Sequence, residues 1–132
     1  MLELKADPSS VEIIYSDSYT GLSGYNALRK LWEQGVRPDA VFGGSDGLTS
    51  GAVRFLYEHG IRIPDDISVL GYEDSILSEY ASPALTVIDA HKEAMGEEAS
   101  AVLINRIKKP RAKEVSLTIK PSLIIRDSVR SR

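Results

Sequence analysis

The stretch Pro38-Asp39-Ala40-Val41-Phe42-Gly43-Gly44-Ser45-Asp46 decides the fold, because it predicts a short, buried strand that runs directly into a helix. Ser45 or Asp46 can cap that helix, since both side chains accept hydrogen bonds from the exposed N–H groups of a first helical turn. Gly60 can end it, because glycine readily takes the left-handed conformation that closes many helices. The apolar residues at helical spacing are Leu48, Ala52, Phe55 and Leu56.

The alternation of strands and helices continues on both sides of this stretch. Upstream, an apolar run at 11–15 predicts a strand, followed by a helix that Ser18 or Thr20 caps and Gly35 ends. Strands that alternate with helices at this spacing pair in parallel through right-handed crossovers, so we expect an α/β fold with a parallel sheet. Downstream, the predicted elements are strands at 67–72, 85–88, 115–120 and 123–125 and a long helix that follows Asp89 and ends at Lys108-Lys109-Pro110.

Composition excludes several classes of function. The 132 residues carry a formal net charge of -3, which argues against a dedicated nucleic-acid surface. The sequence has no cysteine, and His59 and His91 lack metal-ligand spacing, so we expect neither a metal site nor a cofactor. No apolar run approaches the roughly 20 residues that span a bilayer. The sequence also starts without signal-peptide features, so we expect a cytoplasmic chain with no membrane partner.

Three polar segments are expected to lie together at one edge of the sheet. Residues 17–20, 44–47 and 73–75 each follow a predicted strand. Ligands of parallel α/β sheets bind outside the carboxyl ends of the strands. The three segments therefore predict one ligand-binding site.

The side chains of these segments suit a small polar ligand, and each also has a purely structural interpretation. Tyr19 can stack on the apolar face of a sugar or a base, or it can simply cover a helix start. Ser45 and Asp46 can bind a hydroxyl or an anion at a helix N-terminus, or they can serve only as caps. Glu73 and Asp74 can accept hydrogen bonds from sugar hydroxyls, or they can form a solvated acidic turn.

Residues 43–47 also match G-x-S-x-G, the nucleophile elbow of serine hydrolases. Asp74 and His91 follow Ser45 in the chain order of that catalytic triad. However, His91 opens a helix directly after a strand, whereas a triad histidine lies on a loop that returns over the serine. An oxyanion segment of the HGGG type is absent from the sequence. We therefore expect no catalytic residues and keep a serine hydrolase using Ser45 as the last alternative.

The C-terminal end carries a small group of basic residues. Arg126, Arg130 and Arg132 lie within the last seven positions of the sequence. Because chain ends are often poorly ordered, we interpret this group as a frayed, solvent-exposed end.

Several blocks of the sequence resemble one family of bacterial regulators, in the same order and with the same spacing. Residues 37–46 (RPDAVFGGSD) resemble the block "pTAvfaaND", and residues 60–74 (GIRIPDDISVLGYED) resemble "Gl.vPeDisvvGfDD". Residues 80–88, 95–96 and 123–128 resemble "P.LTTV", "mG..A...L" and "LivReST". These are blocks of the LacI/GalR transcription regulators, and the resemblance covers almost the whole chain.

The resemblance implies a parallel, flavodoxin-like sheet of the periplasmic-binding-protein type (type I) with flanking helices, here as an incomplete lobe. In the family, a small-molecule effector such as a sugar or a nucleobase binds between two lobes. Carried over by position, the effector contacts fall on Tyr19, Ser45 and Glu73, within the three strand-end segments; Asp46 and Asp74 complete the effector-binding candidates. Ser45 and Glu73 replace the usual asparagine and aspartate, so we expect an atypical or weakly bound ligand.

The resemblance also implies how the chain is divided. Residues 1–132 correspond to a partial effector-binding domain without DNA-binding parts, so we expect no DNA binding by this chain alone. Residues 86–110 correspond to the crossover strand and helix that pack on the first lobe, which this sequence does not contain. Because the apolar face of that helix needs a partner, we expect self-association. The family also dimerises through the helix after Asp46, where Ser50 replaces a frequent leucine.

The expected function is therefore that of an effector-sensing and oligomerisation segment of a LacI-type regulator, and not that of an enzyme. Two alternatives remain besides the hydrolase. One is a truncated remnant that folds and self-associates without sensing a ligand. The other is a periplasmic sugar-binding protein, against which the absent signal peptide and the block at 60–74 both argue.

Overall fold

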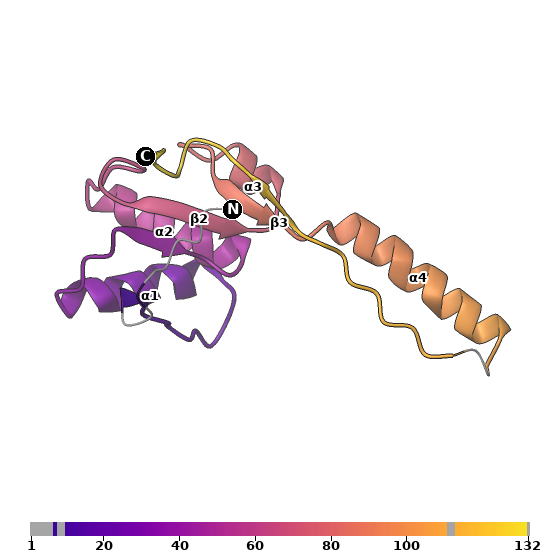
Figure 1. Ribbon diagram of the computed structural model, residues 1–132. Helices are drawn as coiled ribbons and strands as arrows, with labels where there is room; N and C mark the ends of the chain where they lie inside the picture. Colours follow the sequence, from indigo (N-terminus) through magenta and orange to yellow (C-terminus); the bar gives the residue numbers. More distant parts are fainter. Residues whose placement is uncertain (1–6, 8–9, 111–112, 132) are drawn as a thin grey trace.

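A four-stranded sheet forms the centre of the molecule (Figure 1). The computed structural model describes residues 7, 10–110 and 113–131. The strands are β1 (Ala40–Phe42), β2 (Ser68–Tyr72), β3 (Thr86–Asp89) and β4 (Ser122–Ile124), in the spatial order β1-β2-β3-β4. The first three strands pair in parallel, which confirms the α/β prediction, and β4 joins β3 in the antiparallel sense.

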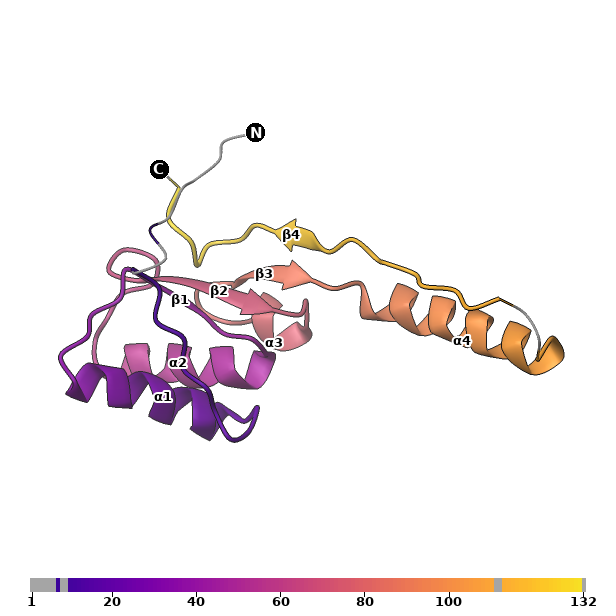
Figure 2. The same cartoon turned by 60° about the horizontal axis from the view of Figure 1, so that its bottom comes forward.

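Three helices lie on the same side of this sheet (Figure 2). They are α1 (Gly21–Glu33), α2 (Asp46–Glu58) and the short α3 (Ile76–Glu79). Thr20 caps α1 by accepting a hydrogen bond from the Ser23 N–H, and Gly35 and Gly60 take positive φ just after α1 and α2. The predicted beginnings and ends of α1 and α2 are therefore confirmed.

The core lies between α2 and the sheet, where Phe55, Leu56, Val69 and Val87 are fully buried. Phe55 is also the centre of an aromatic group, because the rings of Tyr25 and Trp32 meet it edge-on and the ring of His59 stacks on it. Of the apolar residues predicted to share a face of α2, Ala52, Phe55 and Leu56 lie in this core, whereas Leu48 does not.

A polar network ties α1 to α2 at the surface. The hydroxyl of Tyr25 donates to one carboxylate oxygen of Glu58, and Nε of Arg54 donates to the other, both at 2.8 Å. The hydrogen bond from Arg54, and then that from Tyr25, hold the pKa of Glu58 below its ordinary value. The network holds the first turns of α1 beside the last turn of α2.

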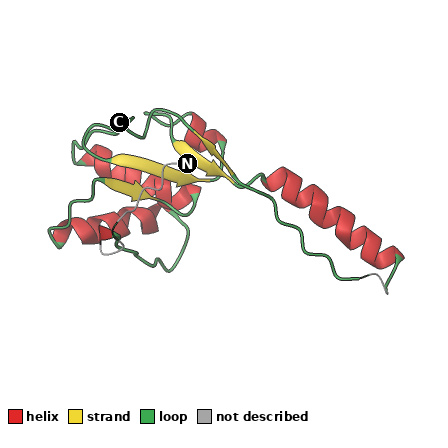
Figure 3. Cartoon of the chain, viewed as in Figure 1, coloured by secondary structure: helices red, strands yellow, loops and turns green. Residues whose placement is uncertain are grey.

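Two predicted strands are wrong. Residues 11–15 are extended and exposed, but they pair with no other strand in the described part of the chain. Residues 115–120 are likewise extended without a sheet partner (Figure 3). Both segments have the residue types of a strand, but a strand is defined by its ladder of inter-strand hydrogen bonds, which a local pattern cannot supply. The short strand predicted before Ser45 does form, as β1, but the prediction that it is buried is wrong, because β1 is an edge strand and Phe42 is 55% exposed.

The last helix, α4 (Lys92–Lys108), stands away from the sheet (Figure 1). None of its residues is buried, and Met95, Leu103 and Ile107 are at least half exposed. Asp89 does not cap α4 directly. It accepts hydrogen bonds from the main-chain N–H and from Nδ1 of His91, the left-handed residue that precedes the helix.

Candidate functional site

The carboxyl ends of β1 and β2 carry two of the candidate segments side by side. The strands are neighbours in parallel register, with Phe42 opposite Leu70. Ser45 therefore follows one strand and Glu73 follows the next at the same edge of the sheet. This is the edge at which parallel sheets bind ligands.

The third candidate segment reaches this edge from the loop before α1. The carbonyl oxygen of Tyr19 lies so close to Gly47 that a Cβ at position 47 would overlap it. Gly47 thus permits the contact between residues 17–20 and the start of α2. The side chain of Tyr19 is 77% exposed, so its ring is available to a ligand.

Ser45 serves as a helix cap. Its Oγ accepts a hydrogen bond from the Leu48 N–H at 3.2 Å, and buried Thr49 donates to the Ser45 carbonyl at 2.8 Å. These contacts fix the turn between β1 and α2. They use Oγ as an acceptor only, so the hydroxyl proton remains able to donate to a ligand.

Asp46 lines a pocket that is separate from the strand-end edge. A pocket of about 300 Å³ lies between α2, α3 and the segment that follows α3. Its lining is mostly apolar, and it comprises Asp46, Ser50, Val53, Arg54, Tyr57, Leu77, Ser78, Ala81, Ser82 and Leu85.

Glu73 occupies a strained turn directly after β2. Its φ is 78°, a left-handed conformation that costs a non-glycine residue about 1–2 kcal/mol. Its main-chain N–H donates to the Ile88 carbonyl at 2.8 Å, which ties the turn to β3. The side chain is half-buried at the edge of the sheet.

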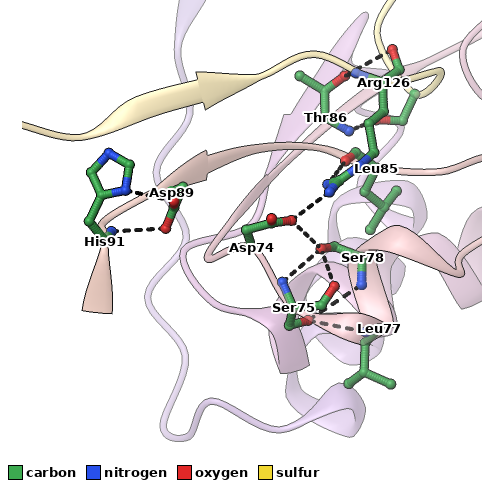
Figure 4. Close-up of polar contacts among 10 residues, drawn as sticks. Asp74, Ser75, Leu77, Ser78, Leu85, Thr86, Asp89, His91 and Arg126 are labelled. Atoms are coloured by element: carbon green, nitrogen blue, oxygen red, sulfur yellow. Dashed lines mark hydrogen bonds and ion pairs between the residues drawn. The ribbon is translucent and has the colours of Figure 1, made fainter. Parts of the chain in front are cut away.

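Asp74 points toward the C-terminal part of the chain (Figure 4). Its Oδ1 accepts a hydrogen bond from Nη2 of Arg126 at 2.7 Å and a long one from Ser78 Oγ at 3.5 Å. One oxygen of this carboxylate is therefore occupied inside the protein, whereas no such bond is described for the Glu73 carboxylate.

Arg126 lies in a different environment from the solvent-exposed one that the sequence predicts for it. Its side chain is only 17% exposed, and it donates to Asp74 and to the Leu85 carbonyl. The interpretation of Arg126 as part of a frayed end is therefore wrong. The block "LivReST" contained the signal, because an arginine inside a recognisable motif is less expected at a loose end.

The geometry does not support a serine hydrolase. His91 binds Asp89 through Nδ1 at 2.8 Å, Asp74 binds Arg126, and Ser45 caps α2. The hydrogen bond between nucleophile and base that a triad requires does not occur among the described residues. Within the same part of the chain, no cluster of three or more histidine, aspartate or glutamate side chains could hold a metal ion. None of the described helices is long and apolar enough to cross a membrane.

The fold and the strand-end edge define a class of binding protein, and sequence comparison agrees. Residues 3–129 match the family model described as "Periplasmic binding protein-like domain". The chain therefore belongs to the periplasmic binding protein-like domain family. Within it, the chain corresponds to the effector-binding region of the LacI/GalR regulators, which confirms the resemblance found in the sequence.

Relatives and solved structures support this placement. The HTH-type transcriptional repressor PurR of Yersinia pestis (strain Pestoides F) is 40% identical over 122 residues, which cover 92% of this chain and 36% of the repressor. The transcriptional regulator CelR in complex with cellobiose superposes with a TM-score of 0.81 at 34% identity, over 91% of this chain and 38% of that one. A LacI family regulator from Enterococcus faecalis with bound ribose gives 0.83 at 29% identity, over 90% and 43%.

The chain spans about 36% of the length of the curated relatives that it matches. These relatives are HTH-type transcriptional repressors.

Proposed function

We propose that the chain is an effector-sensing segment of a LacI/GalR-type transcription regulator and that it works in the cytoplasm. The observation that carries the proposal is that Ser45 and Glu73 follow neighbouring parallel strands, while the main chain of Tyr19 lies against the start of α2. The periplasmic binding protein-like fold and the similarity to sugar-bound regulators support it.

The chemistry of the site favours a small polyhydroxylated ligand such as a sugar. Glu73 supplies acceptors for sugar hydroxyls, and Ser45 supplies a donor. Tyr19 supplies an exposed ring for the apolar face of a pyranose or furanose. Two of the similar structures hold cellobiose and ribose, which belong to this chemical class.

Signalling would work by a shift of populations. A ligand that binds one arrangement of the regulator more tightly than another shifts the equilibrium toward the first, and the DNA affinity of the remaining domains changes with it. In this proposal residues 1–132 form part of the effector-binding domain, and residues 86–110 pack on the other lobe. None of the described helices corresponds to a DNA-reading helix, so we expect no operator binding by the chain alone.

Isothermal titration calorimetry against pentoses, hexoses, their phosphates, disaccharides and purines tests the proposal. We expect heat from at least one ligand, with at least a tenfold loss of affinity in Glu73→Gln, because a neutral amide accepts weaker hydrogen bonds. Glu79→Gln is the matched control, since Glu79 is an exposed acid on α3. A folded sample that gives no heat with any ligand would instead support a chain that folds without sensing.

Self-association is the second part of the proposal. The apolar face of α4 is exposed, and so is the α2–α3 face, where Tyr57 and Leu77 are 81% and 63% exposed beside the mostly apolar pocket. Exposed apolar area of this kind is a frequent mark of protein–protein contact. We propose that, in the chain alone, a second copy packs on the α4 face that the other lobe covers in a whole regulator.

A further inference from the structure

The guanidinium of Arg126 links the C-terminal part of the chain to the segments just after β2 and just before β3 (Figure 4). Its Nη2 donates to Asp74 Oδ1 at 2.7 Å, after β2, and its Nη1 donates to the Leu85 carbonyl at 3.0 Å, before β3. Its main chain is also fixed, because its N–H donates to Thr86 Oγ1 at 2.9 Å and its carbonyl accepts from the same hydroxyl at 3.2 Å. Hydrogen bonds therefore hold both the main chain and the guanidinium of Arg126.

Asp74 receives its main hydrogen bond from this arginine. Its contact with Ser78 Oγ is long, at 3.5 Å, and Ser78 Oγ lies closer to the Ser75 carbonyl, at 2.8 Å. The Asp74 side chain is only 32% exposed, so its charge is partly shielded from water. A partly buried carboxylate without its cation pays a desolvation cost, and the loop that carries it moves to recover solvent.

Glu73 stands directly before Asp74 and depends on its neighbours for its conformation. A left-handed non-glycine residue persists where the surrounding structure over-determines it. On one side, the Glu73 N–H is held by the Ile88 carbonyl; on the other, Asp74 is held by Arg126. The strained residue, Glu73, is therefore held by a hydrogen bond of its own N–H and by the hydrogen bond of the next side chain.

We propose that Arg126 is a positioning residue that fixes the Glu73 carboxylate at the strand-end site through Asp74. The role of Glu73 as a ligand contact rests on the proposed function, whereas the positioning itself is a property of the ligand-free chain. Asp74 accordingly supports the site and does not contact the effector.

Amide hydrogen exchange by NMR on the whole chain tests this without a ligand. In Arg126→Met we expect the Glu73 amide to exchange at least about tenfold faster, because its turn has lost one of its two attachments. The amides of Phe55 and Leu56 in the buried part of α2 should change much less, and Arg126→Lys should restore part of the protection. Asp74→Ala removes the acceptor of the same hydrogen bond, so it should reproduce the effect, and the double variant should add little to either.

Two results would overturn the positioning role. One is an unchanged Glu73 amide in both Arg126→Met and Asp74→Ala. The other is an equal acceleration at Glu73, Phe55 and Leu56, which would mean that the pair contributes only to global stability. If Arg126→Met does not fold, Asp74→Ala still decides the question, because it removes the same hydrogen bond from the Asp74 side. If calorimetry finds no ligand while Glu73 responds as expected, the positioning stands and the sensing function fails.

Discussion

Gly51 of α2 lies against the carbonyl oxygen of Gly21 at the start of α1, and a Cβ at position 51 would overlap that oxygen. The two helices can approach this closely because residue 51 has no side chain at the contact, whereas a Cβ at position 21 would meet no atom closer than 3.5 Å. The same approach brings the loop that carries Tyr19 to the start of α2. The position of one candidate ligand contact thus depends on helix packing.

Gly51→Ala should destabilise the protein by about 1–3 kcal/mol, because the new methyl group meets main-chain atoms that cannot rotate away. Urea unfolding followed by the fluorescence of Trp32 measures the change. Gly44→Ala is the matched control, since a Cβ at Gly44 meets nothing within 4 Å. Equal stability of the two variants would show that α1 and α2 can separate without cost.

Phe55→Ala should cost about 3–5 kcal/mol, because Phe55 is fully buried and its removal leaves a cavity among three aromatic side chains. The same unfolding experiment measures it. Leu22→Ala, at a position that is 70% exposed on α1, should change stability by no more than about 0.5 kcal/mol. A small loss in the first variant would mean that the core does not centre on Phe55.

Asp66 should contribute to the acid sensitivity of the protein. Hydrogen bonds from the Arg62 side chain and main-chain N–H lower the pKa of Asp66 to about 2. Because the folded pKa is depressed, the contribution to stability is present above the unfolded value near 4 and is lost as the pH falls toward 2. Melting temperatures of the wild type should therefore fall more steeply from pH 4 to pH 2 than those of Asp66→Asn. Parallel curves would argue against the Arg62–Asp66 pair in solution.

Ile107→Asp should weaken self-association if α4 forms the contact between copies. Ile107 is 69% exposed on the apolar face of α4, and a carboxylate there would be buried by a partner. Light scattering coupled to size exclusion should show an oligomer for the wild type and a monomer for the variant. Lys108→Asp, one position along, controls for the added negative charge, and a monomeric wild type at high concentration would contradict the proposal.

Local signals predicted much of this fold from the sequence. Thr20 and Ser45 cap their helices, and Gly35 and Gly60 end them, because capping depends on residues within one turn. The strand–helix alternation also predicted the parallel pairing of β1, β2 and β3. Whether one particular strand-like segment finds a partner in the sheet was not predictable from its own residues. Residues 11–15 have strand-like composition but no neighbouring strand in the described chain.

The candidate site also combines features that the sequence predicts with features that it does not. The placement of Ser45 and Glu73 at one sheet edge follows from chain order and parallel pairing. The engagement of Asp74 by Arg126 joins residues 52 positions apart, and no periodic pattern encodes such a contact. The left-handed conformation of Glu73 is equally invisible in the sequence, because glutamate gives no local reason to expect it.

Titration of the ¹⁵N-labelled chain with each sugar and purine of the panel, followed by amide chemical shifts, tests the central claim most directly. The largest shifts should fall together on Tyr19, Ser45 and Glu73 at the carboxyl edge of the sheet. Shifts concentrated instead on α4 or on the α2–α3 pocket, or no shift with any ligand, would contradict the assignment of this edge as the effector site.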